Sequence, residues 1–433
     1  MTYAETLNYL YSALPMFSRM GSAAFKKDLT NIKILCESLG NPQQKFKSVH
    51  VGGTNGKGSV SHMLAAVLQK SGYKTGLYTS PHLYDFRERI RVNGKVVSEE
   101  FVVNFTEAIM PLAETIQPSF FEITVAMAFQ YFAFEKVDVA VVEVGLGGRL
   151  DSTNILTPDL AVITNIGWDH MNMLGNTLQE IAGEKAGIIK AGIAVVIGET
   201  LAETKTVFEN AAKEKQAQVF FAESCFQNIA HELSSFHLQA SFYRKEGSTV
   251  VSVETDLPGL YQVQNLRTVL TAVDVLSDLG WNLHKDDVQS ALKQTKVLTG
   301  LYGRWEVIHE KPTVVLDVAH NQNGIEQMLQ HVAKLSFHQL RIVFGTVKDK
   351  DTAGILSLLP SSAAYYFTQA HIPRALPAED LKNQAAVRNV KGELYADVNL
   401  ALAAALTDAN DEDLILVCGS IFLVAEVKRE IFV

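Results

Sequence analysis

The chain has 433 residues, of which 47% are hydrophobic and 20% are charged. This length exceeds what one hydrophobic core usually supports, and the composition is typical of globular rather than disordered proteins. The net charge of −9 excludes an overall basic character of the kind that binds nucleic acid. We therefore expect two globular domains and no nucleic-acid partner.

The N-terminus, the cysteines and the hydropathy predict where the protein works. Cys36, Cys225 and Cys418 lie far apart without metal-ligand spacing, which favours reduced, buried thiols over disulfides. Glu5 stands where a secretory signal would carry Lys or Arg. No run of about 18 apolar residues occurs, so no membrane span is expected. We expect a cytoplasmic monomer without a membrane partner.

Short Val- and Ile-rich runs alternate with helical patterns in the first part of the chain. Apolar residues recur with helical spacing between positions 60 and 68, and Gly72 ends that helix. The apolar runs are too short for helices and predict buried strands. They are residues 48–51, 137–144, 160–166 and 193–197. This alternation predicts a parallel sheet with helices on both faces.

The texture changes further along the chain. Residues 217–255 alternate at shorter spacing around Glu246-Gly247, which predicts a small antiparallel excursion. Residues 298–303 contain two glycines and few helix signals, which predicts a hinge. The strand–helix rhythm then resumes, with strands predicted at residues 313–318, 341–344, 364–367 and 414–417. We predict an α/β fold in both parts.

The strongest local signal is VHVGGTNGKGS at residues 49–59, which follows a predicted strand and opens a predicted helix. A glycine-rich loop in that place aims backbone N–H groups at phosphate oxygens, and Lys57 would reach the outer phosphates. The general P-loop pattern would put its first glycine at Val51, and Gly58 separates Lys57 from Ser59. The alternative is a tight strand-to-helix turn. The predicted phosphate-binding residues are Gly53, Thr54, Asn55, Gly56, Lys57, Gly58 and Ser59.

Candidate magnesium ligands follow other predicted strands. Glu143 ends the run VDVAVVEV before a glycine turn, His170 lies in TNIGWDH, and Ser80 follows Leu77-Tyr78. Side chains at the carboxyl ends of parallel strands face the crevice where ligands bind. Oxygen ligands suit magnesium, although histidine is unusual. Alternatively, Glu143 accepts hydrogen bonds from the turn, and His170 is structural.

Lys185 shares a helical face with apolar residues between 178 and 189. Such a lysine usually extends its charged end to water. If it stayed buried as a cation, it would be repelled by magnesium, whereas capture of CO₂ as a carbamate would turn oxygens toward the metal. The nearby glycine turn, residues 145–148, lacks the spacing of a dinucleotide fingerprint, and RLDSTN after it does not open a helix.

Taken in order, several segments resemble the folylpolyglutamate synthase and dihydrofolate synthase family of the Mur-ligase superfamily. They are GGTNGKGS, TSPHL, EVGLGGRLDSTN, TNIGWDH, EKAGIIK, YQVQN, YGRWE and LDVAHN, followed by a weaker match at GSIFLVAE. Each motif alone is weak, but the ordered set is specific. Val318, Gln322, Phe422 and Ala425 depart from the usual pattern and weaken inference about the C-terminal half of the substrate site.

The resemblance implies a P-loop ATPase domain over residues 1–298, followed by a smaller Rossmann-like glutamate ligase domain over residues 299–433. ATP and Mg²⁺ are the implied cofactors. Asn265 would contact the adenine, Arg304 would approach the phosphates, and Asp317 would hold the ribose. The implied metal ligands are Ser80, Glu143, His170 and Lys185, whose side chain is typically carbamylated in this family. The pterin-bearing substrate would lie near Ser119, Phe121, Leu150, Asp151 and Ser152.

The implied reaction is an ATP-dependent ligation through an acyl phosphate, because a carboxylate is a poor electrophile until it is phosphorylated. L-glutamate would then attack the activated dihydropteroate or folate. The predicted catalytic residues are Lys57, Lys185 and His320; His320 would place the amino acid or the phosphates, or have a structural role. A Mur-type ligase acting on a cell-wall precursor and a non-ligating nucleotide switch are the alternatives. The sequence leaves open whether dihydropteroate, folates or both are used.

Overall fold

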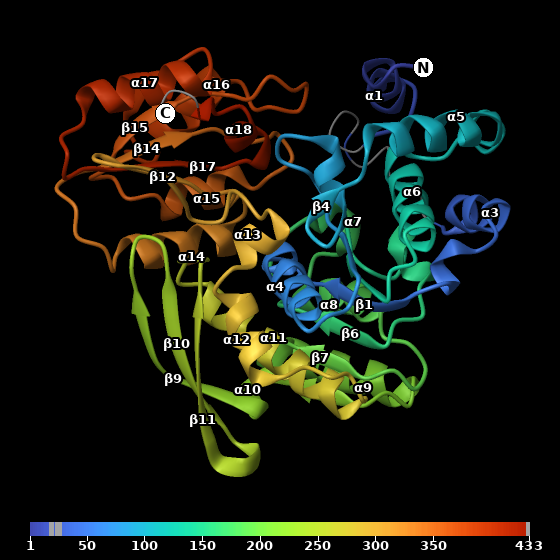
Figure 1. Cartoon of the computed structure of the whole chain (residues 1–433). Helices are drawn as coiled ribbons and strands as arrows, with labels where there is room; N and C mark the ends of the chain where they lie inside the picture. Colours follow the sequence, from blue (N-terminus) through green and yellow to red (C-terminus); the bar gives the residue numbers. More distant parts are fainter. Residues whose placement is uncertain (17–20, 22–27, 430–433) are drawn as a thin grey trace. The chain divides into compact units, whose positions relative to one another are not determined.

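The computed structural model describes residues 1–16, 21 and 28–429 and divides into two compact units. The first unit takes up most of the chain as far as Leu301. The second begins at Tyr302 and also includes two short segments, Leu233–Leu238 and Leu257–Gln262. Each unit is built around its own sheet (Figure 1).

The sheet of the first unit has eight strands in the order β4-β3-β2-β5-β1-β6-β7-β8. Its central strand, β1, pairs in parallel with β5 on one side and β6 on the other. The strands are β1 (Lys47–Gly52), β2 (Thr75–Tyr78), β3 (Ile90–Val92), β4 (Lys95–Val96), β5 (Val139–Glu143), β6 (Leu160–Ile163), β7 (Val195–Ile197) and β8 (Val219–Phe221). The predicted parallel sheet is confirmed. Its antiparallel edge, β3 and β4, was not predicted, although Asn93-Gly94 between them is a hairpin signal.

Helices pack against this sheet through apolar residues. Phe129 of α6 belongs to one buried cluster with Val142 of β5, and Ile181 of α8 belongs to another with Ile163 of β6. The helices are α1 (Tyr3–Ser12), α3 (Thr30–Ser38), α4 (Lys57–Lys70), α5 (Glu99–Ile116), α6 (Phe120–Phe134), α7 (Met171–Leu174), α8 (Leu178–Ala186), α9 (Ala202–Glu214), α10 (Ala222–Cys225), α11 (Gln262–Asp278), α12 (Lys285–Leu292) and α13 (Thr295–Thr299). The predicted helix after the glycine-rich loop is α4.

A separate antiparallel sheet is formed by β9 (Phe226–Leu233), β10 (Leu238–Arg244) and β11 (Thr249–Thr255). The predicted antiparallel excursion is therefore right for these strands, including the turn at Gly247. It is wrong at its start, because β8 pairs in parallel with β7 and belongs to the large sheet. The run VFF is too short for its periodicity to reveal which sheet it joins.

The second unit has a six-stranded sheet in the order β12-β13-β17-β14-β15-β16, parallel except for β12. The strands are β12 (Glu306–Glu310), β13 (Thr313–Leu316), β14 (Leu340–Phe344), β15 (Ala364–Phe367), β16 (Gly392–Leu394) and β17 (Leu414–Cys418). The helices are α14 (Gln322–Val332), α15 (Thr352–Leu358), α16 (Ala378–Ala386), α17 (Val398–Asp408) and α18 (Ile421–Ala425). The four predicted strands form; the edge strands β12 and β16 were missed.

The predicted hinge, residues 298–303, contains the end of α13 and the change from the first unit to the second. Gly300 and Gly303 both have φ of +69°, a conformation that glycine adopts without strain. Leu298 and Thr299 are helical, which the few helix signals in this segment did not indicate.

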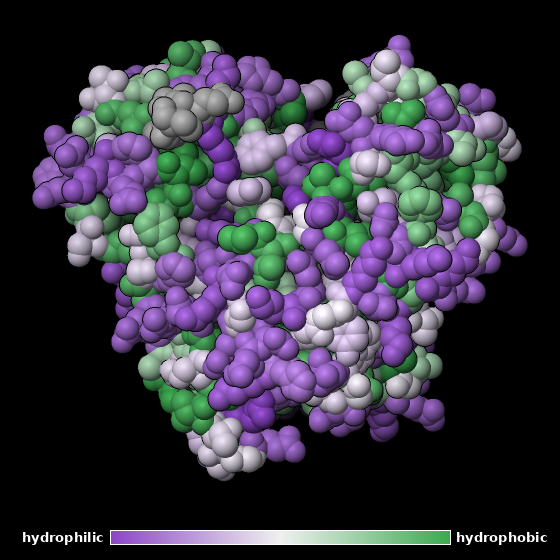
Figure 2. Space-filling model, in the orientation of Figure 1, coloured by the Kyte–Doolittle hydropathy of each residue, from purple (hydrophilic) through white to green (hydrophobic). Residues whose placement is uncertain are grey.

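Surface and cysteine positions complete the fold. Hydrophilic residues predominate on the face shown in Figure 2, and hydrophobic residues form separated patches there. Among the described residues, no helix has both the length and the apolar character needed to cross a bilayer. All three cysteines are free, but only Cys36 and Cys418 are buried; Cys225 is partly exposed, contrary to the prediction of buried thiols.

Candidate active site

The glycine-rich loop joins the end of β1 to the start of α4, as its sequence predicts. Gly53 has φ of +139°, and an added Cβ would lie 1.9 Å from Thr164 Oγ1. Gly56 has φ of +81°, and its added Cβ would lie 2.4 Å from Asn265 Oδ1. Both positions therefore require glycine for conformation and for space. The second contact also places Asn265, the predicted adenine ligand, beside this loop. We call residues 53–59 the phosphate loop.

Bonds to the segment after β6 hold the phosphate loop in place. The Thr54 amide donates to Asn165 O at 3.0 Å, and the Asn55 amide donates to Asn165 Oδ1 at 2.8 Å. Thr164 Oγ1 donates to Asn55 O at 2.5 Å, and the Gly167 amide donates to Thr54 Oγ1 at 3.0 Å. Two motifs more than a hundred residues apart thus form one structure.

Two lysines from different helices approach the phosphate loop. Lys57 Nζ, at the start of α4, donates to Thr54 O at 2.9 Å, and Lys185 Nζ, from α8, donates to Gly53 O at 2.7 Å. Lys185 is only 4% exposed, so the alternative in which it reaches water is wrong. Burial, with a smaller effect of the Lys57 charge, lowers the pKa of Lys185 to about 7. Cationic groups and helix N-terminal amides gathered in this way favour an anion.

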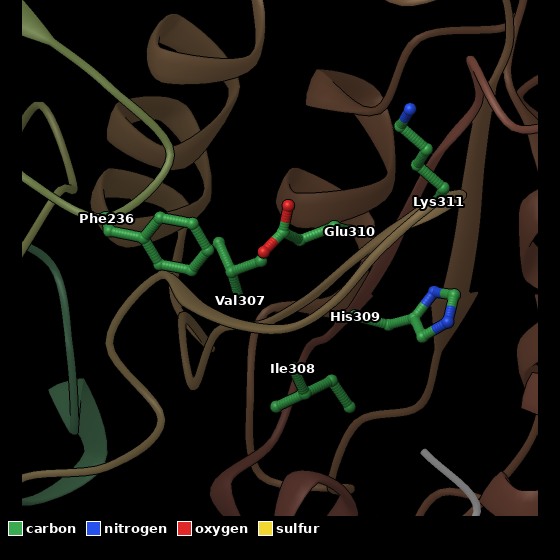
Figure 3. A pocket seen from close by; sticks show the side chains of 6 residues that line it. All are labelled: Phe236, Val307, Ile308, His309, Glu310 and Lys311. Atoms are coloured by element: carbon green, nitrogen blue, oxygen red, sulfur yellow. The ribbon is translucent and has the colours of Figure 1, made fainter. Parts of the chain in front are cut away.

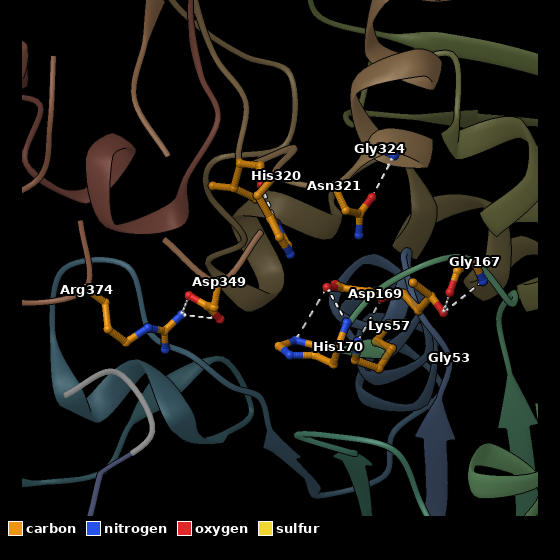
Figure 4. A network of polar contacts seen from close by, with 12 residues as sticks. Gly53, Lys57, Gly167, Asp169, His170, His320, Asn321, Gly324, Asp349 and Arg374 are labelled. Atoms are coloured by element: carbon orange, nitrogen blue, oxygen red, sulfur yellow. Dashed lines mark hydrogen bonds and ion pairs between the residues drawn. The ribbon is translucent and has the colours of Figure 1, made fainter. Parts of the chain in front are cut away.

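Two of the predicted magnesium ligands come together at the carboxyl ends of β2 and β5. Glu143 is 5% exposed, and its Oε2 accepts a hydrogen bond from the Ser80 amide at 3.1 Å. His170 precedes α7 with φ of +49°, and its Nε2 lies 3.7 Å from Asp169 Oδ1. Figure 4 shows Asp169 and His170 near Lys57 and Gly53.

The donor chemistry around Glu143 suits a hard cation. Within the described ranges, no three His, Cys, Asp or Glu side chains gather into a metal-binding group. A magnesium ion there would therefore depend on the Glu143 carboxylate, the Ser80 hydroxyl and phosphate oxygens of a nucleotide, which is the way magnesium is commonly bound. The roles of His170 and Lys185 as ligands remain predictions.

The glycine turn after Glu143 is organised by Asp151. Its carboxylate accepts hydrogen bonds from the Leu146 amide at 2.8 Å, the Thr153 amide at 3.0 Å and Thr153 Oγ1 at 2.5 Å. Asp151 is 2% exposed, and burial raises its pKa. Residues Ser152–Ile155 form a 3₁₀ helix after Asp151. As expected, this segment does not begin an α-helix.

The other predicted substrate residues lie at the start of α6 and beside this turn. Ser119 caps α6: its Oγ accepts from the Glu122 amide at 3.2 Å, while Glu122 Oε2 accepts from the Ser119 amide at 2.7 Å. The Phe121 ring lies against Gly145, whose added Cβ would be 2.4 Å from Phe121 Cζ. Leu150 is half-buried and Ser152 is buried. Phe121 thus borders the turn that Asp151 organises, whereas the Ser119 hydroxyl is engaged in capping.

In the second unit, Asp317 is surrounded by protein donors. Its Oδ2 accepts from Tyr261 Oη at 2.8 Å and from the Trp305 amide at 3.0 Å, and its Oδ1 accepts from the Ala319 amide at 2.8 Å. Burial raises the pKa of Asp317 and, still more strongly, that of Tyr261. Arg304 is half-buried and donates to Gly303 O at 3.2 Å.

Trp305 and His331 support this cluster. Trp305 has φ of +47°, which is rare for a bulky residue, and its ring stacks on His331 with centroids 3.9 Å apart. His331 Nδ1 accepts from the Leu260 amide at 3.1 Å. Tyr261 lies in the motif YQVQN and Trp305 in YGRWE, but neither residue was predicted to belong to the site. His331 carries no sequence signal, since it is one apolar-face position of a helix.

His320 follows β13 in the same unit. Its Nδ1 lies 2.9 Å from Val318 O, and the neighbouring Asn321 caps α14 by accepting from the Gly324 amide at 2.8 Å. Figure 4 shows this cap, and also the Arg374–Asp349 ion pair, with Nη2 2.9 Å from Oδ1. The geometry gives His320 a structural contact, and its catalytic role remains a prediction.

A pocket of about 480 Å³ opens along β12 in the second unit. Its lining comprises Phe236, Val307, Ile308, His309, Glu310 and Lys311 (Figure 3). None of the predicted site residues lines it. It therefore adds nothing to the nucleotide or substrate assignments.

Comparison with known proteins shows the family of the chain. Residues 51–273 match the Mur ligase middle domain, and residues 303–421 match the Mur ligase glutamate ligase domain. The chain is 35% identical to the dihydrofolate synthase/folylpolyglutamate synthase of Bacillus subtilis, over 94% of this chain and 95% of the relative. It is 33% identical to the folylpolyglutamate synthase of Lacticaseibacillus casei, over 99% and 98%.

Solved structures give the same result. Folylpolyglutamate synthase of Mycobacterium tuberculosis complexed with ADP superimposes with a TM-score of 0.88 at 31% identity, covering 99% of this chain and 98% of that one. E. coli FolC in complex with DHPP and ADP gives a TM-score of 0.86 at 30% identity, covering 100% and 98%. The chain therefore belongs to the Mur ligase family of ATP-dependent carbon–nitrogen ligases, among the dihydrofolate synthase/folylpolyglutamate synthases that its ordered motifs resemble.

Proposed function

We propose that this enzyme adds L-glutamate to dihydropteroate, to folates, or to both, and that ATP first converts the acceptor carboxylate into an acyl phosphate. The observation that carries the proposal is the convergence of Lys57 Nζ and Lys185 Nζ on one glycine-rich loop at a helix N-terminus. This arrangement suits a polyphosphate. Relatives named for dihydrofolate and folylpolyglutamate synthesis, similar over nearly the whole chain, support the choice of substrates.

The phosphate loop supplies positioning and electrostatic stabilisation, which are the main sources of catalysis in phosphoryl transfer. Loop amides and the N-terminus of α4 would hold the ATP phosphates. Lys57 would leave the Thr54 carbonyl and neutralise the charge that moves with the γ-phosphoryl group. Asn265, which lies beside Gly56, would contact the adenine.

Glu143 and Ser80 would hold magnesium beside the phosphates. When bound, the ion supplies further neutralisation of phosphate charge. Lys185 would contribute as a carbamate: its pKa of about 7 leaves a substantial neutral fraction, and only a neutral amine attacks CO₂. The carbamate would exchange a buried cation for an anion near Lys57. His170 is the further proposed ligand.

Residues around the glycine turn and in the second unit would contact the remaining parts of the substrates. Phe121 and Ser152 border the turn and would contact the pterin-bearing substrate. Ser119 and Asp151 would shape the binding site for this substrate through their hydrogen bonds at the start of α6 and in the turn. Arg304 would approach the phosphates, Asp317 the ribose, and His320 the amino acid. After glutamate nitrogen attacks the acyl carbon, the carbon–oxygen bond to phosphate breaks and phosphate leaves.

The test is product formation with ATP, Mg²⁺ and L-glutamate, supplying dihydropteroate or tetrahydrofolate in separate reactions. Mass spectrometry should show one added glutamate on at least one acceptor, with stoichiometric phosphate release. Addition to dihydropteroate alone would assign dihydrofolate synthesis, and addition to tetrahydrofolate would assign polyglutamate extension. No adduct with either acceptor, despite ATP binding, would overturn the proposal in favour of a Mur-type cell-wall ligase or a nucleotide switch.

We also propose that the enzyme acts as a monomer in the cytoplasm. The free cysteines, of which Cys36 and Cys418 are buried, suit a reducing compartment. Light scattering at micromolar concentration should give the mass of a single chain, 47.6 kDa. A mass of twice that value would contradict the monomeric state without affecting the assigned chemistry.

A further inference from the structure

A buried chain of hydrogen bonds joins the strand before the phosphate loop to the glycine turn. His50, in β1, is 0% exposed, and its Nε2 lies 2.8 Å from Thr153 Oγ1. Thr153 is also 0% exposed, and its hydroxyl donates to Asp151 Oδ1 at 2.5 Å. His50 and Thr153 are 103 positions apart in sequence, so the connection exists only in the folded chain.

The direction of each hydrogen bond follows from the single proton of the threonine hydroxyl. Asp151 otherwise accepts from the Leu146 and Thr153 amides, so its carboxylate acts as an acceptor and takes the Thr153 proton. The Thr153 oxygen must then accept from His50, which carries its proton on Nε2. Burial, with a smaller effect of the Lys190 charge, lowers the pKa of His50 to about 3, so this neutral form persists.

This chain fastens one side of the glycine turn, and other bonds fasten the opposite side. Asn154 Nδ2 donates to Arg149 O and to Gly187 O, both at 3.0 Å. The Arg149 amide donates to Glu184 O in α8 at 2.8 Å. Asp151 and its neighbours are therefore held between β1 and the end of the helix that carries Lys185.

We propose that His50 and Thr153 are positioning residues for the carboxylate substrate: they fix Asp151, and through it the glycine turn and Ser152, in the arrangement that receives this substrate. The proposal rests on the function proposed above. Neither residue is accessible, so both act through the turn rather than by contact.

The bonds that hold the phosphate loop make a different set. They run from Thr54 and Asn55 to Thr164 and Asn165, and none passes through Thr153. Loosening the chain from His50 to Asp151 should therefore weaken use of the carboxylate substrate more than use of ATP. A merely structural defect would instead lower the fraction of folded enzyme and leave both KM values unchanged.

Thr153→Val is the first variant, because it removes the hydroxyl while keeping the side-chain shape. Its matched control is Thr106→Val, which removes an equally buried hydroxyl that donates to Val102 O within α5. With the acceptor that the wild type uses, we expect Thr153→Val to raise the KM for that acceptor about tenfold and the KM for ATP less than about twofold. Thr106→Val should change neither. An unchanged acceptor KM in Thr153→Val, or equal changes in both variants, would overturn the proposal.

Substitutions of His50 test the direction of the chain. A glutamine amide can place an N–H donor near the position of Nε2, whereas leucine cannot. We expect His50→Gln to keep the acceptor KM within about threefold of wild type, and His50→Leu to match Thr153→Val. The double variant His50→Leu/Thr153→Val should be no worse than either single change, since both break one chain. Additive effects would refute a shared chain.

A binding measurement separates failure of this proposal from failure of the proposed function. Calorimetric titration of wild type and Thr153→Val with dihydropteroate and with an unhydrolysable ATP analogue needs no turnover. Wild type that binds dihydropteroate but forms product with neither dihydropteroate nor tetrahydrofolate would contradict the proposed function alone. A Thr153→Val enzyme that binds dihydropteroate as tightly as wild type would contradict the positioning role alone.

Discussion

The phosphate loop of the first unit and the Asp317 cluster of the second both contain buried charged groups, but their partners differ in kind. Lys57 Nζ and Lys185 Nζ donate to backbone carbonyl oxygens, which carry only partial charge. The Asp317 carboxylate accepts from a tyrosine hydroxyl and two amides, so that both of its oxygens have protein donors. The first region gathers two ammonium groups on one glycine-rich loop, whereas the carboxylate of the second is surrounded by protein donors.

This difference separates a region arranged for an incoming anion from one that also holds the protein together. A buried ammonium group beside a carbonyl gains much when a phosphate or carboxylate arrives, so ligand binding is expected to rearrange the phosphate loop. The Asp317 carboxylate would receive a ribose hydroxyl beside its three protein donors, since a carboxylate has about four acceptor sites. Its present bonds also fix Trp305 at a strained φ and anchor Tyr261 near the start of α11. Substitutions should therefore affect activity in the first region and stability in the second.

The largest effect is expected from Lys57→Ala. Loss of this charge should reduce phosphate release about 10³-fold, because transition-state charge goes unbalanced, while the melting temperature stays near that of wild type. The control is Lys70→Ala, in the last turn of the same helix, which should keep full activity. Wild-type turnover in Lys57→Ala would remove the phosphate loop from the mechanism.

Lys185→Met should separate activity from stability most clearly. Turnover should fall about 10²-fold, since the carbamate cannot form, yet the protein should be at least as stable because a desolvated amine is replaced by an apolar chain. Labelling wild type with ¹³CO₂ should give a carbamate signal that the variant lacks. Retained turnover in Lys185→Met, or no carbamate signal from an active wild type, would refute the proposed role.

Tyr261→Phe tests the second region. It removes the hydroxyl that Asp317 Oδ2 accepts, which should lower the free energy of unfolding by about 1–2 kcal/mol. Because the bond lies at the proposed ribose contact and not at the reacting atoms, kcat should remain within about threefold of wild type. Calorimetry and steady-state kinetics on the same preparation give both values. A large loss of kcat at unchanged stability would move Asp317 and Tyr261 into the catalytic machinery.

The smallest effect concerns acid stability of the second region. Burial lowers the pKa of His331 from 6.5 to about 4. Above pH 6.5 the imidazole is neutral in both states and its contribution to stability is complete. Between pH 6.5 and about 4 the unfolded chain takes up a proton that the folded chain refuses, so stability is lost at up to about 1.4 kcal/mol per pH unit.

Replacing His331 with glutamine should therefore flatten the fall in melting temperature between pH 6.5 and 5, although the variant starts from a lower value. The comparison is between slopes, measured by scanning calorimetry at fixed ionic strength. Parallel slopes for wild type and variant would show that His331 is protonated in the folded protein over this range.

Local patterns account for what the sequence could predict. The Val-rich runs predict the central strands. The glycine-rich loop is recognisable because its strand, turn and helix are contiguous in the sequence. Pairings between distant segments have no such signature. Nothing in the sequence pattern indicates that His50 meets Thr153, that Tyr261 meets Asp317, or that VFF joins the large sheet. Asn93-Gly94 was a usable signal for the β3–β4 hairpin, whereas the three residues of β16 offered none.

The predicted site divides in the same way. Lys57 follows directly from the loop pattern, and Lys185 stood out because a lysine interrupts an apolar helical face. Asn265, Arg304 and Asp317 came from family resemblance alone, since adenine, phosphate and ribose contacts leave no periodic trace. In the structure, Asn265 lies beside Gly56, and Asp317 accepts hydrogen bonds from protein groups. No sequence pattern indicates either of these contacts.

The central claim, activation of a carboxylate by the phosphate-loop site, is tested most directly with an isotope. Dihydropteroate or tetrahydrofolate labelled with ¹⁸O in its carboxylate, whichever is converted, should be turned over with ATP, Mg²⁺ and L-glutamate. An acyl phosphate requires one carboxylate oxygen to leave with the transferred phosphoryl group, so the released phosphate should carry one ¹⁸O per product formed. Released phosphate without ¹⁸O would contradict the acyl-phosphate mechanism.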